Sequence, residues 1–267
     1  MTLSLVCFLA GLLGAADLKK DLTFYAGFNG GVEANVALGD KKLYWAANYK
    51  EQGTAQAGLP GPDVELAKGA GRTGDALRFV KKNGKAVFYQ AAKNVAFDPR
   101  NWSGTISFFL NLSPEAELEP GFCDPIQITD KAYNDSAIWV DFTKDDLPRH
   151  FRLGVFGALK AWNPQNVPSD KSPDFMNRLV VVKKHPFTKG KWTHVAVAWS
   201  KLGSGKGEAK LYVDGALQGA TPQIKEAFEW DLAKGAIRLG VAYVGLMDDV
   251  AVYRRPLSEA EIRSLSR

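Results

Sequence analysis

The stretch Trp192-Thr-His-Val-Ala-Val-Ala-Trp199, continued after a polar link by Ala209-Lys-Leu-Tyr-Val213, decides the fold class of this chain. Both runs are rich in residues that favour β-strands, and the first is apolar on both faces, as is typical of a central strand that is covered on both sides. Asp214-Gly215 follows directly and tolerates positive φ, which predicts a tight turn. The pattern predicts a β-hairpin from which the chain returns through 216–219.

Short apolar runs separated by Gly, Pro, Asp and Asn recur along the rest of the chain. No helix of ten or more residues is expected between them, which argues against an alternating βαβ architecture and favours a sandwich or barrel. Further strands are expected at 22–28, 76–80, 86–89, 104–112, 137–142, 151–156, 178–183, 236–240 and 245–253. Long loops are expected at 47–72, 113–135 and 158–177, and loops of this length are often functional.

One helix is predicted near the carboxyl end, at 259–265. Ser258 and Glu261 stand three residues apart in the pattern of a capping box, in which each side chain accepts a backbone N–H from the other's position. Leu257, Ile262 and Leu265 give this helix an apolar side, which we expect to fold back against the sandwich.

Composition indicates a globular protein and argues against a nucleic-acid partner. The 267 residues are 46% hydrophobic and 11% aromatic, which is too apolar for a disordered chain. The formal net charge is +5, but no basic run exceeds two or three residues, whereas a nucleic-acid binder usually carries a clustered basic patch.

Residues 1–16 read as a secretory signal, with an apolar run from Leu3 to Leu13 and small residues up to Ala16. The run is too short to span a bilayer, and the alternative interpretation is a buried amino-terminal strand. Removal of the signal leaves a single domain, 17–267, that is secreted or periplasmic. Cys123 is then the sole cysteine, so no internal disulfide is expected.

An ordered series of short segments carries a family resemblance. The segments are Gly74-Asp-Ala-Leu-Arg-Phe79, Gly104-Thr-Ile-Ser-Phe-Phe-Leu-Asn111, the hairpin, Ile237-Arg-Leu-Gly240, Gly245-Leu-Met-Asp-Asp-Val-Ala-Val-Tyr253 and Arg255-Pro-Leu-Ser-Glu-Ala-Glu-Ile262. In order and spacing they resemble the laminin G-like domains of the concanavalin A-like lectin/glucanase family. The resemblance implies an all-β jelly-roll sandwich of two antiparallel sheets. Members bind carbohydrates or proteins, often hold Ca²⁺ at a rim, and have glycosidases and polysaccharide lyases among their relatives.

The resemblance also implies a possible calcium site. Asp248 stands where family members often have an acid that helps to hold Ca²⁺, and Asn29 stands where they commonly have Asp or Asn. Ca²⁺ takes six to eight oxygen ligands, so these two side chains would need help from backbone carbonyls. The alternative is that Asp248 is a structural, hydrogen-bonded acid.

Catalytic patterns are weak. Glu115, Glu117 and Glu119 mimic the alternating acids of glycosidases on this fold, but they lie between two prolines and are interpreted as solvated loop charge. His194 lies within a predicted strand and is interpreted as structural. A lyase would need a base and a neutralising group, for which Tyr133, His150 and Arg152 are present without a linking motif.

Aromatic side chains in predicted loops are the candidates for stacking on sugar rings, since an aromatic face is apolar and its edge is polar. They are Trp162, the first to test, and Trp45, Tyr49, Tyr133 and Trp230. The alternative for each is a cover over a sheet edge or a loop anchor.

These observations predict a secreted, non-enzymatic binding module with rim loops that recognise a carbohydrate or an extracellular or envelope protein. No membrane span and no nucleic acid are expected. The alternatives are a polysaccharide hydrolase or lyase on the same fold and an accessory domain that works only within an assembly.

Overall fold

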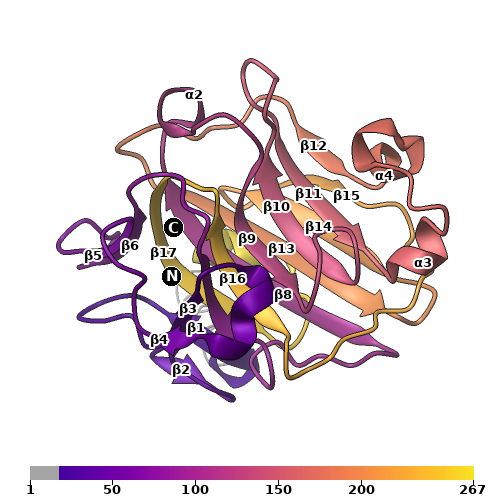
Figure 1. Ribbon diagram of the computed structural model, residues 1–267, viewed down its shortest axis with the longest axis horizontal. Helices are drawn as coiled ribbons and strands as arrows, with labels where there is room; N and C mark the ends of the chain where they lie inside the picture. The colour runs from indigo at the N-terminus through magenta and orange to yellow at the C-terminus, as the bar shows by residue number, and fades with distance from the viewer. Residues whose placement is uncertain (1–17) are drawn as a thin grey trace, which may run out of the picture.

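Two antiparallel β-sheets packed face to face make up the protein (Figure 1). The structure is a computed structural model and describes residues 18–267, so the predicted signal at 1–16 lies outside the described residues. The architecture confirms the predicted all-β jelly-roll sandwich. No helix among residues 18–267 has the length and apolar character needed to cross a membrane.

The first sheet has nine strands. Its main path runs through β15 (Ala216–Ala220), β14 (Glu208–Val213), β13 (Thr193–Leu202), β8 (Trp102–Asn111), β17 (Gly245–Tyr253), β1 (Leu22–Ala26) and β2 (Val36–Ala37). β6 (Ala76–Phe79) also pairs with β17, and β5 (Val64–Ala67) pairs with β6.

The second sheet has eight strands. In spatial order they are β12 (Val180–Val182), β11 (Phe151–Phe156), β10 (Ala137–Phe142), β9 (Cys123–Thr129), β16 (Ala236–Val241), β7 (Ala86–Gln90), β3 (Leu43–Ala46) and β4 (Gln56–Ala57). One face of this sheet meets the first sheet. The other face bears the candidate site described below.

The core lies between the sheets. It is a single cluster of buried apolar side chains that come from strands along the whole chain, from Phe24 on β1 to Val252 on β17. Because side chains alternate along a strand, Val195 and Val197 of β13 and Ile126 and Ile128 of β9 all point into it. Each such side chain stabilises the fold by roughly 1.5–3 kcal/mol when fully buried.

The hairpin prediction from Trp192–Trp199 is confirmed, including the cover on both faces of its first strand. Ala196 and Ala198 point away from the main core, yet they are buried beneath helix α5 (Glu259–Leu265) together with Ile262. The capping box that predicted this helix is complete, with Ser258 accepting from the Glu261 amide and Glu261 accepting from the Ser258 amide.

The three predicted loops contain regular structure, so their assignment as loops was wrong. The loop at 113–135 contains α2 (Pro114–Glu117) and β9, a central strand whose pattern is interrupted by Pro125. The loop at 47–72 contains the 3₁₀ helix η1 (Tyr49–Thr54), β4 and β5. The loop at 158–177 contains α3 (Leu159–Trp162), η2 (Ser169–Lys171) and α4 (Pro173–Asn177), and Figure 1 shows α3 and α4 at one end of the sandwich.

Candidate functional site

Polar side chains gather on the outer face of the eight-stranded sheet. Gln127 on β9 lies opposite Trp139 on β10 on one side and Arg238 on β16 on the other. One row further along, Asp141 lies opposite Arg152. Side chains opposite one another in antiparallel strands point to the same face, so the sheet register builds this cluster from four separate segments of sequence.

A cavity of about 360 Å³ opens on this cluster. Its lining combines charged and amide groups with aromatic and aliphatic ones: Phe122, Asp124, Gln127, Tyr133, Trp139, Asp141, Arg152, Ser169, Phe175, Met176 and Val241. We call this cavity the face pocket. Its volume lies within the range of small-molecule sites, and its mixture of an apolar lining with few polar groups is typical of them.

Arg152 and Asp141 form a buried ion pair in the face pocket. The guanidinium donates from Nε to Asp141 Oδ1 at 2.8 Å and from Nη2 to Oδ2, which is a bidentate arrangement. Arg152 is 6% exposed and Asp141 is 4% exposed. The guanidinium also lies 5.0 Å from the centre of the Phe122 ring, within cation–π range.

Asp124 is the second acid of the face pocket and is held differently. Its Oδ2 accepts from Gln127 Nε2 at 2.8 Å, and within the described residues 18–267 no guanidinium donates to it. Burial, followed by the negative charge of Asp141, raises the pKa of Asp124 to about 8. Burial raises the pKa of Asp141 as well, but there the ion pair with Arg152 acts in the opposite direction, so the Asp141 carboxyl is paired with arginine whereas Asp124 carries a proton at neutral pH.

Arg238 extends this polar network across the sheet. Its Nη1 donates to Gln127 Oε1 at 2.7 Å, and its Nη2 donates to the Lys131 carbonyl at 3.0 Å. Its guanidinium lies 4.4 Å from the centre of the Tyr49 ring. Gln127 is therefore fixed from both sides, which sets the orientation of its amide towards Asp124.

Tyr133 and Phe122 supply the exposed aromatic surface of the face pocket, at 41% and 46% exposure. The Tyr133 hydroxyl lies 2.8 Å from Ser169 Oγ, and its carbonyl accepts from Trp139 Nε1 at 2.6 Å. The Trp139 indole lies over Gly154, where a Cβ would come within 2.1 Å of the ring. The loop that carries Tyr133 is thus held against the sheet, and Tyr133 is a predicted binding residue that the structure places in a pocket.

Trp162 is not the exposed loop aromatic that the sequence predicted, so its expected placement was wrong. It belongs to α3, is 6% exposed, and donates from Nε1 to the Asn134 carbonyl at 3.0 Å. Its ring packs against Phe156 at a centroid distance of 5.0 Å. A buried ring offers no face to a ligand, and Trp162 instead supports the wall of the face pocket through Phe156 and Phe175.

Trp45 and Tyr49 also lie in regular structure rather than in a loop, which corrects their expected placement. Trp45 is on β3 and packs partly buried against the core, with Lys85 Nζ 5.2 Å from its ring centre. Tyr49 is in η1 beneath Arg238. Both lie outside the lining of the face pocket.

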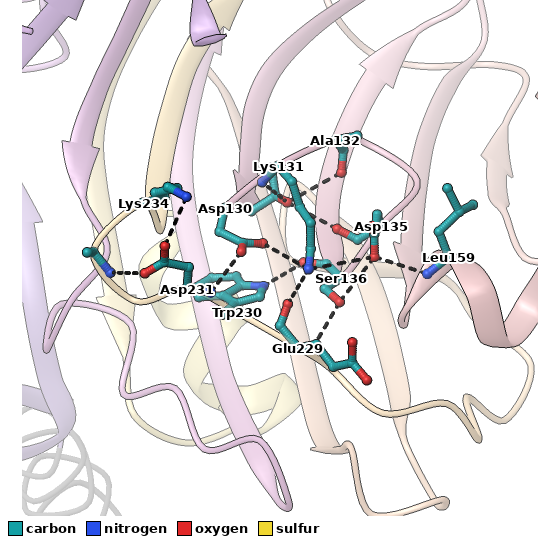
Figure 2. A network of polar contacts seen from close by, with 12 residues as sticks. Asp130, Lys131, Ala132, Asp135, Ser136, Leu159, Glu229, Trp230, Asp231 and Lys234 are labelled. Atoms are coloured by element: carbon teal, nitrogen blue, oxygen red, sulfur yellow. Dashed lines mark hydrogen bonds and ion pairs between the residues drawn. The ribbon is translucent and has the colours of Figure 1, made fainter. Parts of the chain in front are cut away.

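Trp230 acts as a loop anchor at a different edge. Its Nε1 donates to the Ser136 carbonyl at 2.6 Å, and its ring stacks on Phe97 at 4.6 Å. Figure 2 shows the surrounding network, in which Lys131 Nζ reaches the Glu229 carbonyl at 2.6 Å and Asp130 accepts from the Asp231 amide at 2.8 Å. These bonds join the loop after β9 to the segment before β16, so this network holds the strands that carry Gln127 and Arg238.

The two predicted metal ligands both contact the loop at 69–75. Asp248 is 1% exposed, and its two oxygens accept from the amides of Arg72 and Asp249, each at 2.8 Å. Burial raises the pKa of Asp248 to about 6. Asn29 Oδ1 accepts from the Asp75 amide at 2.9 Å.

These residues do not fit a calcium site. The side-chain oxygens of Asp248 and Asn29 each accept a backbone N–H, and the positively charged Arg72 guanidinium, which would repel a cation, binds Asp249 Oδ2 at 2.8 Å beside them. Ca²⁺ needs six to eight oxygens, and among residues 18–267 no group of three His, Cys, Asp or Glu side chains could hold a metal ion. The geometry favours the alternative of a structural, hydrogen-bonded Asp248.

We therefore expect that calcium does not stabilise the protein. A metal that bound only the folded state at 100 times its Kd would add about 2.7 kcal/mol to the free energy of unfolding and raise the melting temperature. Thermal unfolding should give the same midpoint in millimolar CaCl₂ and in EDTA. A midpoint several degrees higher with CaCl₂ would contradict this interpretation.

The catalytic candidates do not gather in one place. Tyr133 and Arg152 line the face pocket, whereas His150 pairs with Asp146 at 3.4 Å on the loop before β11. Glu115 and Glu117 lie on α2, where Glu117 Oε2 accepts from the Ser113 amide at 2.7 Å. His194 is fully buried, and its Nε2 lies 2.8 Å from Ser107 Oγ, which agrees with a structural role.

Sequence reasoning missed most of the polar floor of the face pocket. Phe122, Asp124 and Gln127 fell within a predicted loop, and Asp141 was treated only as part of a strand. The signal that could have found Gln127 and Asp141 is the alternation in Ile126-Gln-Ile128 and Ile138-Trp-Val-Asp141, where polar or indole side chains alternate with aliphatic ones. Alternation alone does not place Asp124 on this face, because the pairing of β9 with β10 shifts register between Ile126 and Cys123.

Comparisons with solved structures show the same fold at low sequence identity. Domain 4 of AbnA, an extracellular GH43 arabinanase from Geobacillus stearothermophilus in complex with arabinotriose, has a TM-score of 0.55 and 13% identity, covering 92% of this chain and 98% of that chain. The ligand-binding domain of botulinum neurotoxin serotype D, in complex with N-acetylneuraminic acid, has a TM-score of 0.58 and 11% identity, covering 95% of this chain and 52% of that one. Trypanosoma rangeli sialidase has a TM-score of 0.51 and 14% identity, covering 92% and 32%.

This chain therefore corresponds to about half of the toxin domain and a third of the sialidase. No curated protein sequence matches it. A family model described as the concanavalin A-like lectin/glucanases superfamily matches residues 126–263, which is just over half of the chain and includes β10, β13 and β17. The chain belongs to the concanavalin A-like lectin/glucanases superfamily.

Proposed function

We propose that this protein is a non-catalytic carbohydrate-binding module, exported from the cell, and that the face pocket is its binding site. The observation that carries the proposal is the composition of that pocket, in which exposed Phe122 and Tyr133 border a floor of Asp124, Gln127 and Arg152. The site lies on the face of a sheet rather than on the rim loops that the sequence predicted.

Sugar chemistry matches this composition. A pyranose or furanose ring has an apolar C–H face that stacks on an aromatic ring and hydroxyl groups at its edge that need hydrogen-bond partners. The Asp124 carboxyl and the Gln127 amide offer such partners at the floor, and both are held in place by neighbours. A rigid floor loses little conformational freedom on binding, which favours affinity.

The comparisons support the proposal in one respect. Two solved domains of the same fold, the arabinanase domain and the toxin domain, are in complex with sugars. At 13% and 11% identity they show a shared fold alone, so the ligand of this chain has to be found from its own pocket.

Removal of the exposed aromatic rings should weaken sugar binding. We expect Tyr133→Ala and Phe122→Ala each to reduce affinity by about tenfold or more, since about 1.4 kcal/mol of lost stacking and apolar contact corresponds to a factor of ten. Affinity electrophoresis and calorimetry on a panel of soluble polysaccharides would measure the effect. Leu217→Ala is the matched control because Leu217 is 45% exposed on β15 of the other sheet.

The outcome that would contradict the proposal is specific. If the folded wild-type protein binds no glycan in the panel, or if the two pocket variants bind as tightly as Leu217→Ala, the face pocket is not a carbohydrate site. Capture of an extracellular or envelope protein with an unchanged affinity in the pocket variants would favour the protein-binding alternative.

A second candidate is a polysaccharide hydrolase, which one observation favours. Burial and the Asp141 carboxylate raise the pKa of Asp124 to about 8, as a general acid requires, and Asp141, whose own pKa burial also raises, lies beside it in the ion pair with Arg152. The two acids lie on adjacent strands in the same pocket. Release of reducing ends from the polymer panel that is lost in Asp124→Asn would establish this candidate, and no release with retained binding would exclude it.

A further inference from the structure

We infer that the face pocket accepts uncharged sugar residues and discriminates against carboxylated ones such as sialic and uronic acids. This inference rests on the proposed function and adds the ligand class. The geometry that carries it is the ion pair of Arg152 with Asp141, together with the excess of carboxylates over guanidinium groups in the lining of the pocket.

Arg152 is the sole cation among the residues that line the face pocket. A bound sugar carboxylate would need the planar side of a guanidinium that offers two parallel N–H groups. On Arg152 the side formed by Nε and Nη2 is occupied by Asp141, at 6% and 4% exposure for the two residues. A ligand carboxylate would have to displace this bidentate partner or bind through Nη1 of a guanidinium whose charge Asp141 already balances.

Two further cations lie just outside the lining. Arg238 gives Nη1 to Gln127, gives Nη2 to a carbonyl, and lies over the Tyr49 ring at 4% exposure, so it is buried beside the floor and does not line the pocket. Lys144, whose Nζ lies 5.6 Å from the centre of the Phe122 ring, pairs with Asp145 at 3.3 Å, and because these side chains are 48% and 78% exposed, water screens the lysine charge.

The charge balance of the floor opposes a second anion. Two carboxylates, Asp124 and Asp141, face one guanidinium, so the lining has a net charge of −1 when both acids are ionised and zero when Asp124 is protonated. A sugar carboxylate would meet repulsion in the first state and no compensating charge in the second. Hydroxyl groups meet neither penalty.

The groups that remain available suit hydroxyls. Among residues 18–267, no donor reaches Asp124 Oδ1, and the Gln127 amide has a second N–H beyond the one given to Asp124. Asp124 accepts or donates according to its protonation, and Gln127 donates. This combination recognises a hydroxyl pair on a sugar ring, which both accepts and donates.

Matched glycans that differ by one acidic group test the inference. We would compare lactose-terminated glycans with their sialylated counterparts, and a neutral β-glucan with its carboxymethylated form, by calorimetry with the full chain. In whichever of these pairs the neutral glycan binds, we expect its acidic counterpart to bind at least tenfold more weakly. Equal or tighter binding of the acidic member would overturn the inference while leaving the proposed function intact.

A variant that releases Arg152 provides the converse test. Asp141→Asn keeps the side-chain volume but removes the charge that occupies Arg152, so we expect acidic glycans to gain affinity relative to neutral ones by tenfold or more. Asp63→Asn is the control, because Asp63 pairs with Lys81 at 3.2 Å ahead of β5 on the other sheet. No change in the acidic-to-neutral ratio in a folded Asp141→Asn protein would contradict the inference.

Asp124→Asn covers the case in which Asp141→Asn does not fold, as judged by its melting curve. This substitution removes the other acid and leaves Arg152 paired with Asp141. It should reduce the discrimination against acidic glycans above pH 8, where Asp124 is ionised in the wild type, but not at pH 6, where Asp124 is protonated. Absence of binding to every glycan, neutral or acidic, overturns the proposed function and this inference together.

Discussion

Arg152→Met is expected to lower the free energy of unfolding by about 3–5 kcal/mol, which is the cost of leaving one member of a buried ion pair without its partner. Asp141 would remain at 4% exposure with no guanidinium to neutralise it. The loss should therefore exceed what the removed contacts alone would predict. Denaturant unfolding monitored by tryptophan fluorescence would measure it.

The double variant Arg152→Met, Asp141→Leu should recover most of this loss, since two apolar side chains of similar volume impose no charge penalty. Lys81→Met is the matched control, because it breaks an ion pair in which the lysine side chain is 62% exposed and should cost less than about 1 kcal/mol. A single-variant loss no larger than that of Lys81→Met would show that the pair is not buried as described.

Asp124→Asn is expected to become progressively more stable than the wild type as the pH rises from 5 to 8. In the folded protein the pKa of Asp124 is about 8, whereas in the unfolded chain it is about 3.9. Between these values the folded state binds a proton that the unfolded state has lost, so rising pH destabilises the wild type. Asparagine cannot titrate, so the variant escapes this penalty.

The difference in melting temperature between Asp124→Asn and the wild type should grow across that window and become constant above pH 8. Asp231→Asn is the control, because the pKa of Asp231 is lowered by its hydrogen bond to Lys234 and its effect should be constant from pH 5 to 9. A flat profile for Asp124→Asn would show that Asp124 is ionised at neutral pH.

The fold could be predicted from the sequence because the patterns that indicate its strands and its helix α5 each lie within a short segment. The alternation in 137–142, 151–156 and 245–253 predicted three strands with the bounds that the structure has. Ser258 and Glu261 predicted α5 in the same way, through a cap that needs no distant residue. β9 was not predicted because Pro125 interrupts the alternation of its side chains. In the structure it is nevertheless a strand, because it pairs with β10 on one side and with β16 on the other.

The candidate site was harder to predict from the sequence, because it depends on the register between strands and on the segments that pack over the sheet. Asp124, Asp141 and Arg152 meet since β9, β10 and β11 are adjacent in one sheet, which no short segment of sequence specifies. The prediction for Tyr133 agrees with the structure in that its aromatic side chain is exposed and lies outside the strands, and the structure adds that it lines the face pocket. Trp162 has the same kind of sequence context, yet the packing of α3 and α4 buries it.

The central claim is that a sugar binds on the outer face of the eight-stranded sheet, and a crystal structure with a bound oligosaccharide tests it most directly. The oligosaccharide would be the tightest-binding member of the polysaccharide panel. We predict density for a sugar ring against Phe122 and Tyr133, within hydrogen-bond distance of Asp124 and Gln127. Density instead at the edge formed by Trp230, or beside Asn29 and Asp248, with the face pocket filled only by water, would contradict the account.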